Sequence, residues 1–314
     1  MDLIERLQIA FPFSRREAMQ LVNTAPYRYK IHLIEKRNGR GKRLIAQPTA
    51  ELKLVQKWLL ESYLKPLPIH AAAMAYRSGV GIKDHAQLHA SSRYLLKLDF
   101  ENFFPSIRGE DFREHASIFL NLSLPDENAL TRLLFREERN TNQLVLSIGA
   151  PSSPMVSNTI LYAFDSSMGK YCEEMDVRYS RYADDLAFST NRPRVLSELK
   201  GFVVDLCERL KYPRLRLNEG KTVFTSKKNQ RQLTGLILSN DGRASLGRER
   251  KRNIRAMMHR YEHGVLGVME VVRLRGLIAF AFSIDPEFVG LLRNMVGEEK
   301  YANLMRGLES EEKQ

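Results

Sequence analysis

Two adjacent aspartates, Asp184 and Asp185, stand between two short runs rich in β-forming residues, 177–182 and 186–189. The pattern predicts a β-hairpin whose tight turn carries both carboxylates. Like charges repel at this spacing, and hard carboxylate oxygens are the ligands that Mg²⁺ prefers, so the pair is a candidate metal site. The alternative is that the two aspartates lie in an ordinary solvated turn. Further acids brought to the same place would favour the metal site over that alternative.

A third acid, Asp99, ends the apolar run 93–98, which predicts a buried strand. A carboxylate there is costly unless it is paired or bound to a metal, so Asp99 is a candidate third ligand. Acids from separate strands can hold two metal ions that activate a primer hydroxyl and stabilise pyrophosphate. Lys221, in a later loop, can supply charge or a proton to the leaving phosphates. Together with a Gly-Ala-Pro-Ser-Ser-Pro loop at 149–154, these residues resemble a polymerase palm in their order and spacing.

Two further segments could meet a nucleotide. Residues 149–154, Gly-Ala-Pro-Ser-Ser-Pro, predict a loop that leads into a helix, and Gly149 would let the backbone approach a ligand. Residues 27–46 predict a long β-hairpin with a basic tip at 37–41. The tip and its neighbours Lys42 and Arg43 could bind a triphosphate, and a solvated loop is the alternative.

The charge balance favours a polyanionic partner. The 49 Lys and Arg residues exceed the 37 Asp and Glu residues, which gives a formal net charge of +12 and makes nucleic acid the leading candidate. From residue 248 the chain predicts a basic amphipathic helix, in which Arg250, Lys251 and Arg255 alternate with apolar residues. Its alternative is a solvated helix face. His85 and His89, four residues apart, have no third ligand nearby, so packing or RNA contact is favoured over metal.

The composition is that of a globular protein. A chain of 314 residues with 43% hydrophobic residues can bury a large core and divides into two or three units of typical size. Two cysteines indicate no disulfide framework, which fits a reducing cytoplasm. Charge close to the N-terminus argues against a secretory signal, and the longest apolar run, 277–284, is too short for a bilayer. We therefore expect a soluble, cytoplasmic protein without membrane contact.

Over nearly its whole length the sequence resembles reverse transcriptases, and most closely the bacterial retron reverse transcriptases. The segments that look like core polymerase and fingers motifs are 28–48, 98–106, 149–154, 182–185 and 218–222. Leu233, Thr234 and Gly235 are similar to the retron Val-Thr-Gly motif, and 85–89 to its Asn-Ala-x-x-His motif. The sequence departs from the retron signatures at His85, which replaces Asn, and at Leu233, which replaces Val, and both departures concern the subfamily. Ile148 stands where glutamine is usual, which removes a polar side chain expected near the nucleotide and implies a difference in fidelity or substrate handling.

The resemblance implies an α+β, right-hand polymerase fold. N-terminal helices and fingers would occupy 1–92, a palm with an antiparallel sheet and inserted fingers helices 93–247, and a helical thumb 248–314. The reaction implied is RNA-directed DNA synthesis.

The resemblance also implies roles for individual residues. Two Mg²⁺ ions would be held by Asp99, Asp184, Asp185 and the carbonyl of Phe100. Arg43, with Lys42, would clamp the triphosphate near the backbone of Gly149, and Lys221 would neutralise pyrophosphate. Phe104 falls where an aromatic gate excludes the ribose 2′-hydroxyl, which implies dNTP substrates. His85, His89, Thr234, Gly235, Arg250, Lys251 and Arg255 would contact nucleic acid.

The partners implied are a cognate structured noncoding RNA and its cDNA. The RNA would act as template and as primer, through an internal guanosine 2′-hydroxyl, and the product would be branched multicopy single-stranded DNA (msDNA). No RNase H domain is recognisable, so a host RNase H would remove the template. A neighbouring gene could encode an effector protein used in anti-phage defence. The alternatives are a general or intron-type reverse transcriptase, and an RNA-DNA nucleoprotein scaffold that restrains such an effector.

Overall fold

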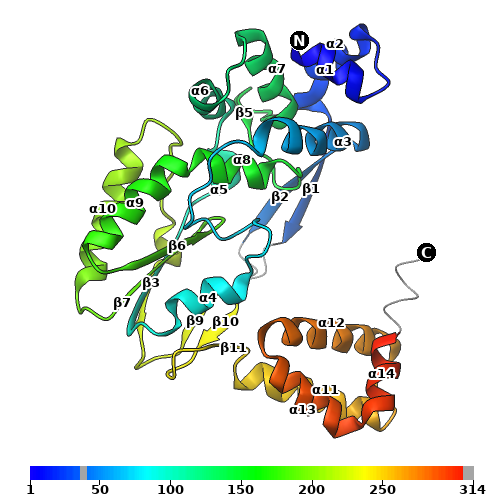
Figure 1. Ribbon diagram of the computed structural model, residues 1–314, viewed down its shortest axis with the longest axis vertical. Coiled ribbons are helices and arrows are strands. Elements are labelled where there is room, and N and C mark those ends of the chain that lie inside the picture. The colour runs from blue at the N-terminus through cyan, green and yellow to red at the C-terminus, as the bar shows by residue number, and fades with distance from the viewer. Residues whose placement is uncertain (36–40, 307–314) are drawn as a thin grey trace. The chain divides into compact units, whose positions relative to one another are not determined.

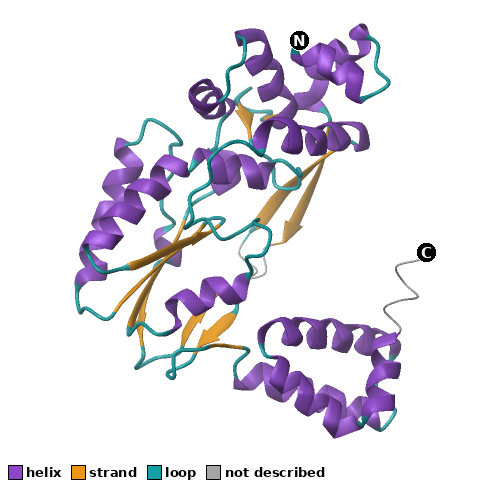
Figure 2. Cartoon of the chain, in the orientation of Figure 1, coloured by secondary structure: helices purple, strands orange, loops and turns teal. Residues whose placement is uncertain are grey.

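The computed structural model of the protein describes residues 1–35 and 41–306, which form the helices and small sheets shown in Figures 1 and 2. These elements divide into two compact units. Unit 1 comprises 1–79 and 96–224, and unit 2 comprises 80–95 and 225–314. The predicted hairpin tip at 37–41 lies, except for Gly41, outside the described residues. The division into fingers, palm and thumb is a functional one that these contact units do not test, and it stays a prediction.

Unit 1 begins with short helices and a β-hairpin. The helices are α1 (Leu3–Ala10), α2 (Arg15–Thr24) and α3 (Ala50–Leu59), with a 3₁₀ turn at Ala25–Tyr27 and a π-helical turn at Leu60–Leu64. Capping boxes at Asp2 and Ser14 satisfy the first amides of α1 and α2. The hairpin pairs β1 (Tyr29–Glu35) with β2 (Lys42–Pro48) in antiparallel register, which confirms the predicted hairpin.

The central sheet has the strand order β6-β7-β3-β8. Its strands are β3 (Tyr94–Asp99), β6 (Arg178–Tyr182), β7 (Asp185–Thr190) and β8 (Val223–Ser226). Strands β3 and β7 are almost wholly buried, as their apolar runs predict. The predicted strand ending at Asp99 and the predicted hairpin around Asp184 are both confirmed, and they are neighbours in the sheet.

Helices cover this sheet and link it to the hairpin. They are α5 (Phe103–Ser106), α6 (Gly109–Phe119), α7 (Leu124–Leu134), α8 (Ser153–Ile160), α9 (Tyr162–Glu174) and α10 (Val195–Arg209). A short ladder joins β4 (Arg136–Glu137) to β5 (Leu144–Val145), and a 3₁₀ turn spans Glu219–Lys221. Helix α9 packs against β6, and α10 packs against β7 (Figure 1).

Unit 2 contains a small sheet and a helical bundle. Helix α4 (Ile82–Ala90) packs against the sheet β11-β10-β9, formed by β9 (Arg231–Leu233), β10 (Leu236–Leu238) and β11 (Ala244–Ser245). The bundle consists of α11 (Arg248–Glu262), α12 (Val268–Ile284), α13 (Pro286–Val296) and α14 (Glu298–Arg306).

A tight turn separates β9 from β10 in unit 2. Thr234 and Gly235 both have positive φ, 45° and 80°, and turn the chain back on itself between the two strands. Such a two-residue turn matches the right-handed twist of the strands that it joins. A second turn, at 240–242, joins β10 to β11.

Candidate active site

The β6–β7 hairpin presents the aspartate pair. Tyr182 pairs with Asp185, so Ala183 and Asp184 form a two-residue turn. Ala183 has φ of 57°, a left-handed conformation that costs a non-glycine residue about 1 kcal/mol. The backbone carbonyl of Asp184 accepts a hydrogen bond of 3.1 Å from the amide of Phe100. This bond attaches the turn to the end of β3.

Asp99 is the last residue of β3 and is 5% exposed. Its backbone carbonyl accepts a 2.8 Å hydrogen bond from the amide of Asn218, which brings the 218–221 turn alongside. Lys221, from that turn, places Nζ 2.8 and 2.7 Å from the two carboxylate oxygens of Asp99. Lys221 therefore contacts Asp99 directly, and the turn that carries Asp184 is bonded to the residue that follows Asp99; the roles of these residues in catalysis stay predictions.

The acids in this cluster influence one another. Burial, followed by the charge of Asp99, raises the pKa of Asp184, and the charges of Lys221 and Arg43 oppose this shift. Asp185 is exposed overall, but the protein around its carboxyl group and the charges of Asp184 and Asp99 raise its pKa to about 6. Carboxylates that repel one another in this way gain stability when a cation joins them.

The three carboxylates have the chemistry that a divalent metal ion needs, but in this structure they are not arranged around one ion position. Carboxylate oxygens are the hard ligands that such ions take. Among the residues that the structure describes, no three His, Cys, Asp or Glu side chains are grouped so that they could hold one ion as they stand. The ammonium group of Lys221 occupies both oxygens of Asp99, so a metal ion at Asp99 requires Lys221 to move.

The predicted nucleotide-binding residues lie in the same unit. Arg43 is exposed on β2, and its charge acts on Asp184, so the hairpin brings it near the acids. Lys42 is exposed beside it. Strand β2 is attached to the Gly149 loop because the Ala46 amide donates a 2.8 Å hydrogen bond to the carbonyl of Ile148.

Gly149 and Phe104 show different degrees of constraint. Gly149 has φ of +120°, and a Cβ there would lie 3.1 Å from the carbonyl oxygen of Ala46, so a side chain fits poorly. Phe104 lies in α5, half-buried, with its ring edge-on to Phe103 at 5.2 Å. The roles of both residues toward a nucleotide stay predictions.

The structure adds Tyr76, which sequence reasoning missed. This residue has φ of 61° and is 53% exposed. Burial, and then the charge of Asp184, raises its pKa, which places the phenol within electrostatic reach of the turn. An aromatic residue held in a left-handed conformation is a recognised mark of functional sites. The sequence signal that could have indicated Tyr76 is its position directly before Arg77 and the glycine-containing link at 78–81.

The histidines predicted to contact nucleic acid are buried. His85 and His89 are both 0% exposed on α4, with their rings edge-on at 5.7 Å. Burial lowers the pKa of His85 to about 4, so the ring is neutral at physiological pH. Their side chains therefore pack within unit 2, and in this arrangement they do not reach its surface. Gly235, by contrast, is exposed, and the Thr234 hydroxyl lies 3.5 Å from the carbonyl of Ile82.

Two of the three predicted cations of α11 are half-buried and engaged by other residues of unit 2. Arg250 donates to the carbonyl of Gly235 at 3.1 Å, and Lys251 pairs with Asp285 at 2.5 Å. Arg255 is exposed, although its guanidinium lies 5.1 Å from the ring of Phe288.

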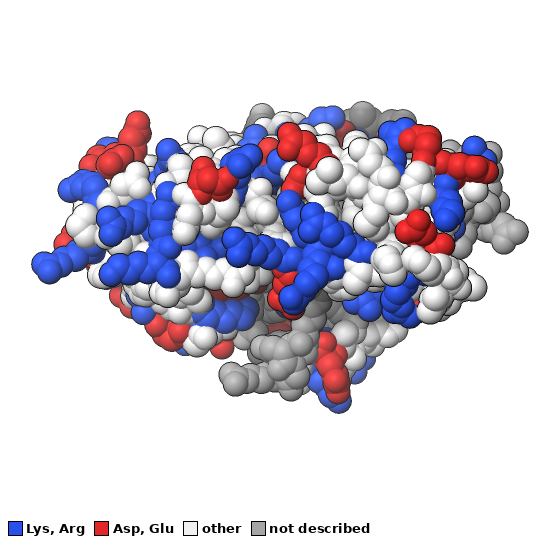
Figure 3. All heavy atoms as spheres, turned by 90° about the horizontal axis from the view of Figure 1, so that it is seen from below, with Lys and Arg blue, Asp and Glu red and all other residues white. Residues whose placement is uncertain are grey.

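One face of α11 carries a set of exposed basic residues, of which Arg255 is one of the three predicted. The spacing i, i+4, i+7, i+11 places four exposed residues on one face, Arg248, Arg252, Arg255 and His259. In the described part of the chain no ion pair joins these four to an acid. Lys and Arg side chains are prominent on the face that Figure 3 displays. A stripe of this kind suits a phosphate backbone.

Comparisons with known proteins agree with this geometry. The family model for reverse transcriptase (RNA-dependent DNA polymerase) matches residues 34–238. The chain is 39% identical to the retron Ec83 reverse transcriptase of Escherichia coli, over 97% of both chains. It is 30% identical to the retron Ec86 reverse transcriptase of the same species, over 85% of this chain and 80% of that one.

A solved structure supports the fold alone. The apo telomerase of Candida tropicalis superposes with a TM-score of 0.50 at 13% identity, covering 90% of this chain and 63% of the telomerase. Within the described residues, no helix has the length and apolar character needed to cross a membrane. Reverse transcriptase domains generally use divalent metal ions, which agrees with the acid cluster. By its family model, its relatives and its right-hand polymerase fold, the chain belongs to the retron reverse transcriptases and is an RNA-directed DNA polymerase.

Proposed function

We propose that this enzyme copies a cognate structured noncoding RNA that also primes the reaction through an internal guanosine 2′-hydroxyl. The product would be branched msDNA. The observation that carries the proposal is the meeting of Asp99 with the Asp184–Asp185 hairpin, next to Lys221 and Arg43. The 39% identity to a retron reverse transcriptase supports the choice of template.

The acids would hold two Mg²⁺ ions. Asp99 comes from β3 and Asp184 and Asp185 from the β6–β7 hairpin, so the site draws ligands from separate strands, with the carbonyl of Phe100 as a further oxygen. Bound Mg²⁺ would lower the pKa of the primer hydroxyl and stabilise charge on the phosphates. The chain's task is to keep the acids ionised and facing one another, which the hydrogen bond from Phe100 to Asp184 supports.

Lys221 would act on the leaving group. In the arrangement described here its ammonium group neutralises Asp99. A cation bound at Asp99 would take over that task, and Lys221, whose side chain is 50% exposed, would turn toward the β- and γ-phosphates of the dNTP. There it would neutralise the charge that develops on pyrophosphate.

Other residues would hold and select the nucleotide. Arg43 and Lys42 are exposed cations on β2 and would clamp the triphosphate, while the open backbone at Gly149 would face the base or sugar. Phe104 would exclude a ribose 2′-hydroxyl, so that dNTPs are used. The α11 stripe would bind phosphates of the RNA, and the helices would recognise its shape rather than its sequence.

The product would pass to other proteins. Host RNase H would remove the copied RNA, and an effector protein encoded nearby would join the RNA-DNA complex in anti-phage defence. The retron relatives support this proposal.

The deciding experiment isolates what the enzyme makes. The protein is expressed with the DNA that flanks its gene, purified, and its bound nucleic acid is treated with RNase and sequenced. We expect one defined DNA that retains a branched ribonucleotide. Asp184→Asn and Asp185→Asn should abolish this DNA but retain bound RNA, whereas Asp205→Asn, an exposed acid on α10, should behave as the wild type.

Two outcomes would contradict the proposal. Heterogeneous DNA copied from unrelated RNAs would indicate a general reverse transcriptase. Normal amounts of the defined DNA from Asp184→Asn would remove the metal-site assignment.

A further inference from the structure

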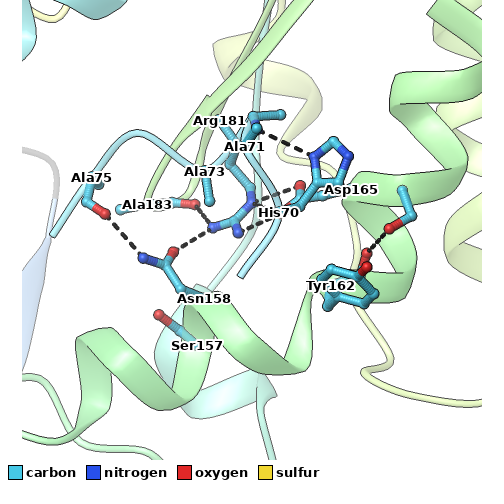
Figure 4. Close-up of polar contacts among 12 residues, drawn as sticks. His70, Ala71, Ala73, Ala75, Ser157, Asn158, Tyr162, Asp165, Arg181 and Ala183 are labelled. Carbon is cyan, nitrogen blue, oxygen red and sulfur yellow. Dashed lines mark hydrogen bonds and ion pairs between the residues drawn. The ribbon is translucent and has the colours of Figure 1, made fainter. Parts of the chain in front are cut away.

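Arg181, at the end of β6, is paired with Asp165 of α9 in the interior of unit 1. Both side chains are 0% exposed. The guanidinium contacts Asp165 in a bidentate manner, with Nη2 2.6 Å from Oδ2 and Nε 2.9 Å from Oδ1 (Figure 4). Tyr179 donates its hydroxyl to Asp165 Oδ1 at 2.6 Å. Burial, and then the charge of Asp165, raises the pKa of Tyr179 well above its usual value, so this hydroxyl stays a donor.

The remaining nitrogen of Arg181 reaches the turn that carries the aspartates. Nη1 lies 3.1 Å from the backbone carbonyl of Ala183 and 3.1 Å from Oδ1 of Asn158 (Figure 4). The carbonyl of Ala183 belongs to the peptide that leads into Asp184. That peptide is thus held by Arg181, while the next carbonyl, of Asp184 itself, is held by the amide of Phe100.

A second arm of the same network reaches the segment that precedes Tyr76. Asn158 Nδ2 donates to the carbonyl of Ala75 at 2.9 Å. The backbone of Arg181 also pairs with this segment, since its amide donates to Ala72 at 2.7 Å and its carbonyl accepts from Met74 at 2.8 Å. One buried arginine therefore connects the aspartate turn with the segment that ends at Tyr76.

A purely stabilising role does not account for this network. Burying two charges costs desolvation energy, and well-packed apolar side chains of the same volume generally serve stability as well. The guanidinium adds a geometric constraint, because its donors lie in one plane at fixed angles and hold several acceptors at once. The left-handed Ala183 needs such support, since an unsupported turn would relax.

We propose that Arg181 is a positioning residue for DNA synthesis, which it supports by fixing the Ala183–Asp184 peptide and, through Asn158, the segment that places Tyr76. Asp165 and Tyr179 orient the guanidinium. The inference rests on the proposed role of Asp184 as a metal ligand. Its consequence is that loss of the network loosens metal binding and slows synthesis without removing any ligand.

Two substitutions separate the orientation of the Arg181 guanidinium from the charge that it contributes to the ion pair with Asp165. Arg181→Lys can keep the ion pair with Asp165 but cannot also reach Ala183 and Asn158 in the fork geometry. Asn158→Ala removes the link to Ala75 and leaves the ion pair intact. The matched control is Arg231→Lys in unit 2, because Arg231 is also buried and, among the described residues, bonds to carbonyls, those of Ser92, Leu238 and Ser239.

The measurements are the rate of RNA-templated dNTP incorporation against Mg²⁺ concentration, with dNTP saturating, and the thermal melting of each variant. Outer-shell partners of metal ligands typically contribute about 10- to 100-fold to metal affinity or activity. We expect Arg181→Lys and Asn158→Ala to raise the half-saturating Mg²⁺ concentration by about ten-fold. Mn²⁺, which binds such ligands more tightly, should partly restore the rate. Arg231→Lys should melt earlier but keep the wild-type Mg²⁺ dependence.

The outcomes distinguish this inference from the proposed function. Wild-type Mg²⁺ dependence in folded Arg181→Lys or Asn158→Ala, together with an inactive Asp184→Asn, would overturn the inference alone. A wild-type enzyme without metal-dependent synthesis, or an active Asp184→Asn, would overturn the proposed function first. If Arg181→Lys does not fold, Asn158→Ala decides, since it leaves the buried ion pair intact.

Discussion

Lys221 contacts both carboxylate oxygens of Asp99, at 2.8 and 2.7 Å, and thereby occupies the carboxylate that we propose as a metal ligand. The side chain of Asp99 is 7% exposed and that of Lys221 is 50% exposed, so the lysine has room to leave and the aspartate does not. A single ammonium group thus stabilises the acid cluster in this structure, and its proposed role at the phosphates would require it to leave Asp99.

Substitution of Lys221 should therefore separate metal binding from turnover. In Lys221→Met the metal ion no longer competes with an ammonium group, so we expect the half-saturating Mg²⁺ concentration to fall by about five-fold, which corresponds to about 1 kcal/mol. The rate at saturating Mg²⁺ should fall about 100-fold, because pyrophosphate leaves without a neutralising group. Mg²⁺-dependent melting and single-turnover kinetics measure the two effects.

The control for Lys221 is Lys65→Met, which removes an exposed ion pair with Glu61 on the helix surface. Lys65→Met should change neither the half-saturating Mg²⁺ concentration nor the rate at saturating Mg²⁺. Weaker Mg²⁺ binding by Lys221→Met would show that the lysine assists metal binding rather than competing with it.

Asp185→Asn should raise the melting temperature of the metal-free protein while it removes activity. In the folded protein the pKa of Asp185 is raised to about 6 from the unfolded value of 3.8, so ionising this carboxyl lowers the free energy of unfolding. The loss is absent below pH 3.8, where the carboxyl is protonated in both states, and it is complete once the pH has risen through 6. In EDTA, Asp185→Asn should melt roughly 1–3 °C higher than the wild type at pH 8 and equally at pH 3.5. Calorimetry at the two pH values tests this, and equal melting at pH 8 would contradict the raised pKa. Added Mg²⁺ should stabilise only the wild type.

Gly149 should be intolerant of a side chain. Gly149→Ala places a methyl group 3.1 Å from the carbonyl of Ala46 at a φ of +120°, so we expect a loss of about 1–2 kcal/mol in unfolding free energy. Because the loop shifts away from β2, the KM for dNTP should also rise. Gly201→Ala, in open space on α10, should instead stabilise the protein by about 0.5–1 kcal/mol and leave KM unchanged. A Gly149→Ala enzyme with normal KM would remove the nucleotide role.

The exposed stripe on α11 should carry RNA binding. Arg252→Gln should weaken binding of a structured RNA and reduce the slope of log affinity against log salt concentration by about 1. Lys251→Gln breaks the ion pair with Asp285, so it should mainly lower the melting temperature. Filter binding across a salt series, with melting curves, separates the two. A larger loss of RNA affinity in Lys251→Gln would reverse this assignment.

The hairpin, the buried strand and the three acids could be predicted from the sequence because their signals are local. Alternation of apolar and polar residues and the short turn at Ala183–Asp184 act over a few neighbours. The side chains of α11 and α4 are different. Periodicity indicated a basic helix and a histidine pair, but whether Lys251 meets Asp285, or whether His85 is buried, depends on segments far along the chain.

By itself the sequence determined which residues are acidic, which strands carry them and to which family the motifs are similar, since each depends on residue type and short-range order. Only the tertiary structure decided that Lys221 occupies Asp99, that Arg181 connects Asp165 to the carbonyl of Ala183, and that Tyr76 lies near Asp184. The physical reason is that hydrogen bonds and ion pairs act over about 3 Å. Partners separated by many residues along the chain reach that distance only when the sheet and its covering helices have formed.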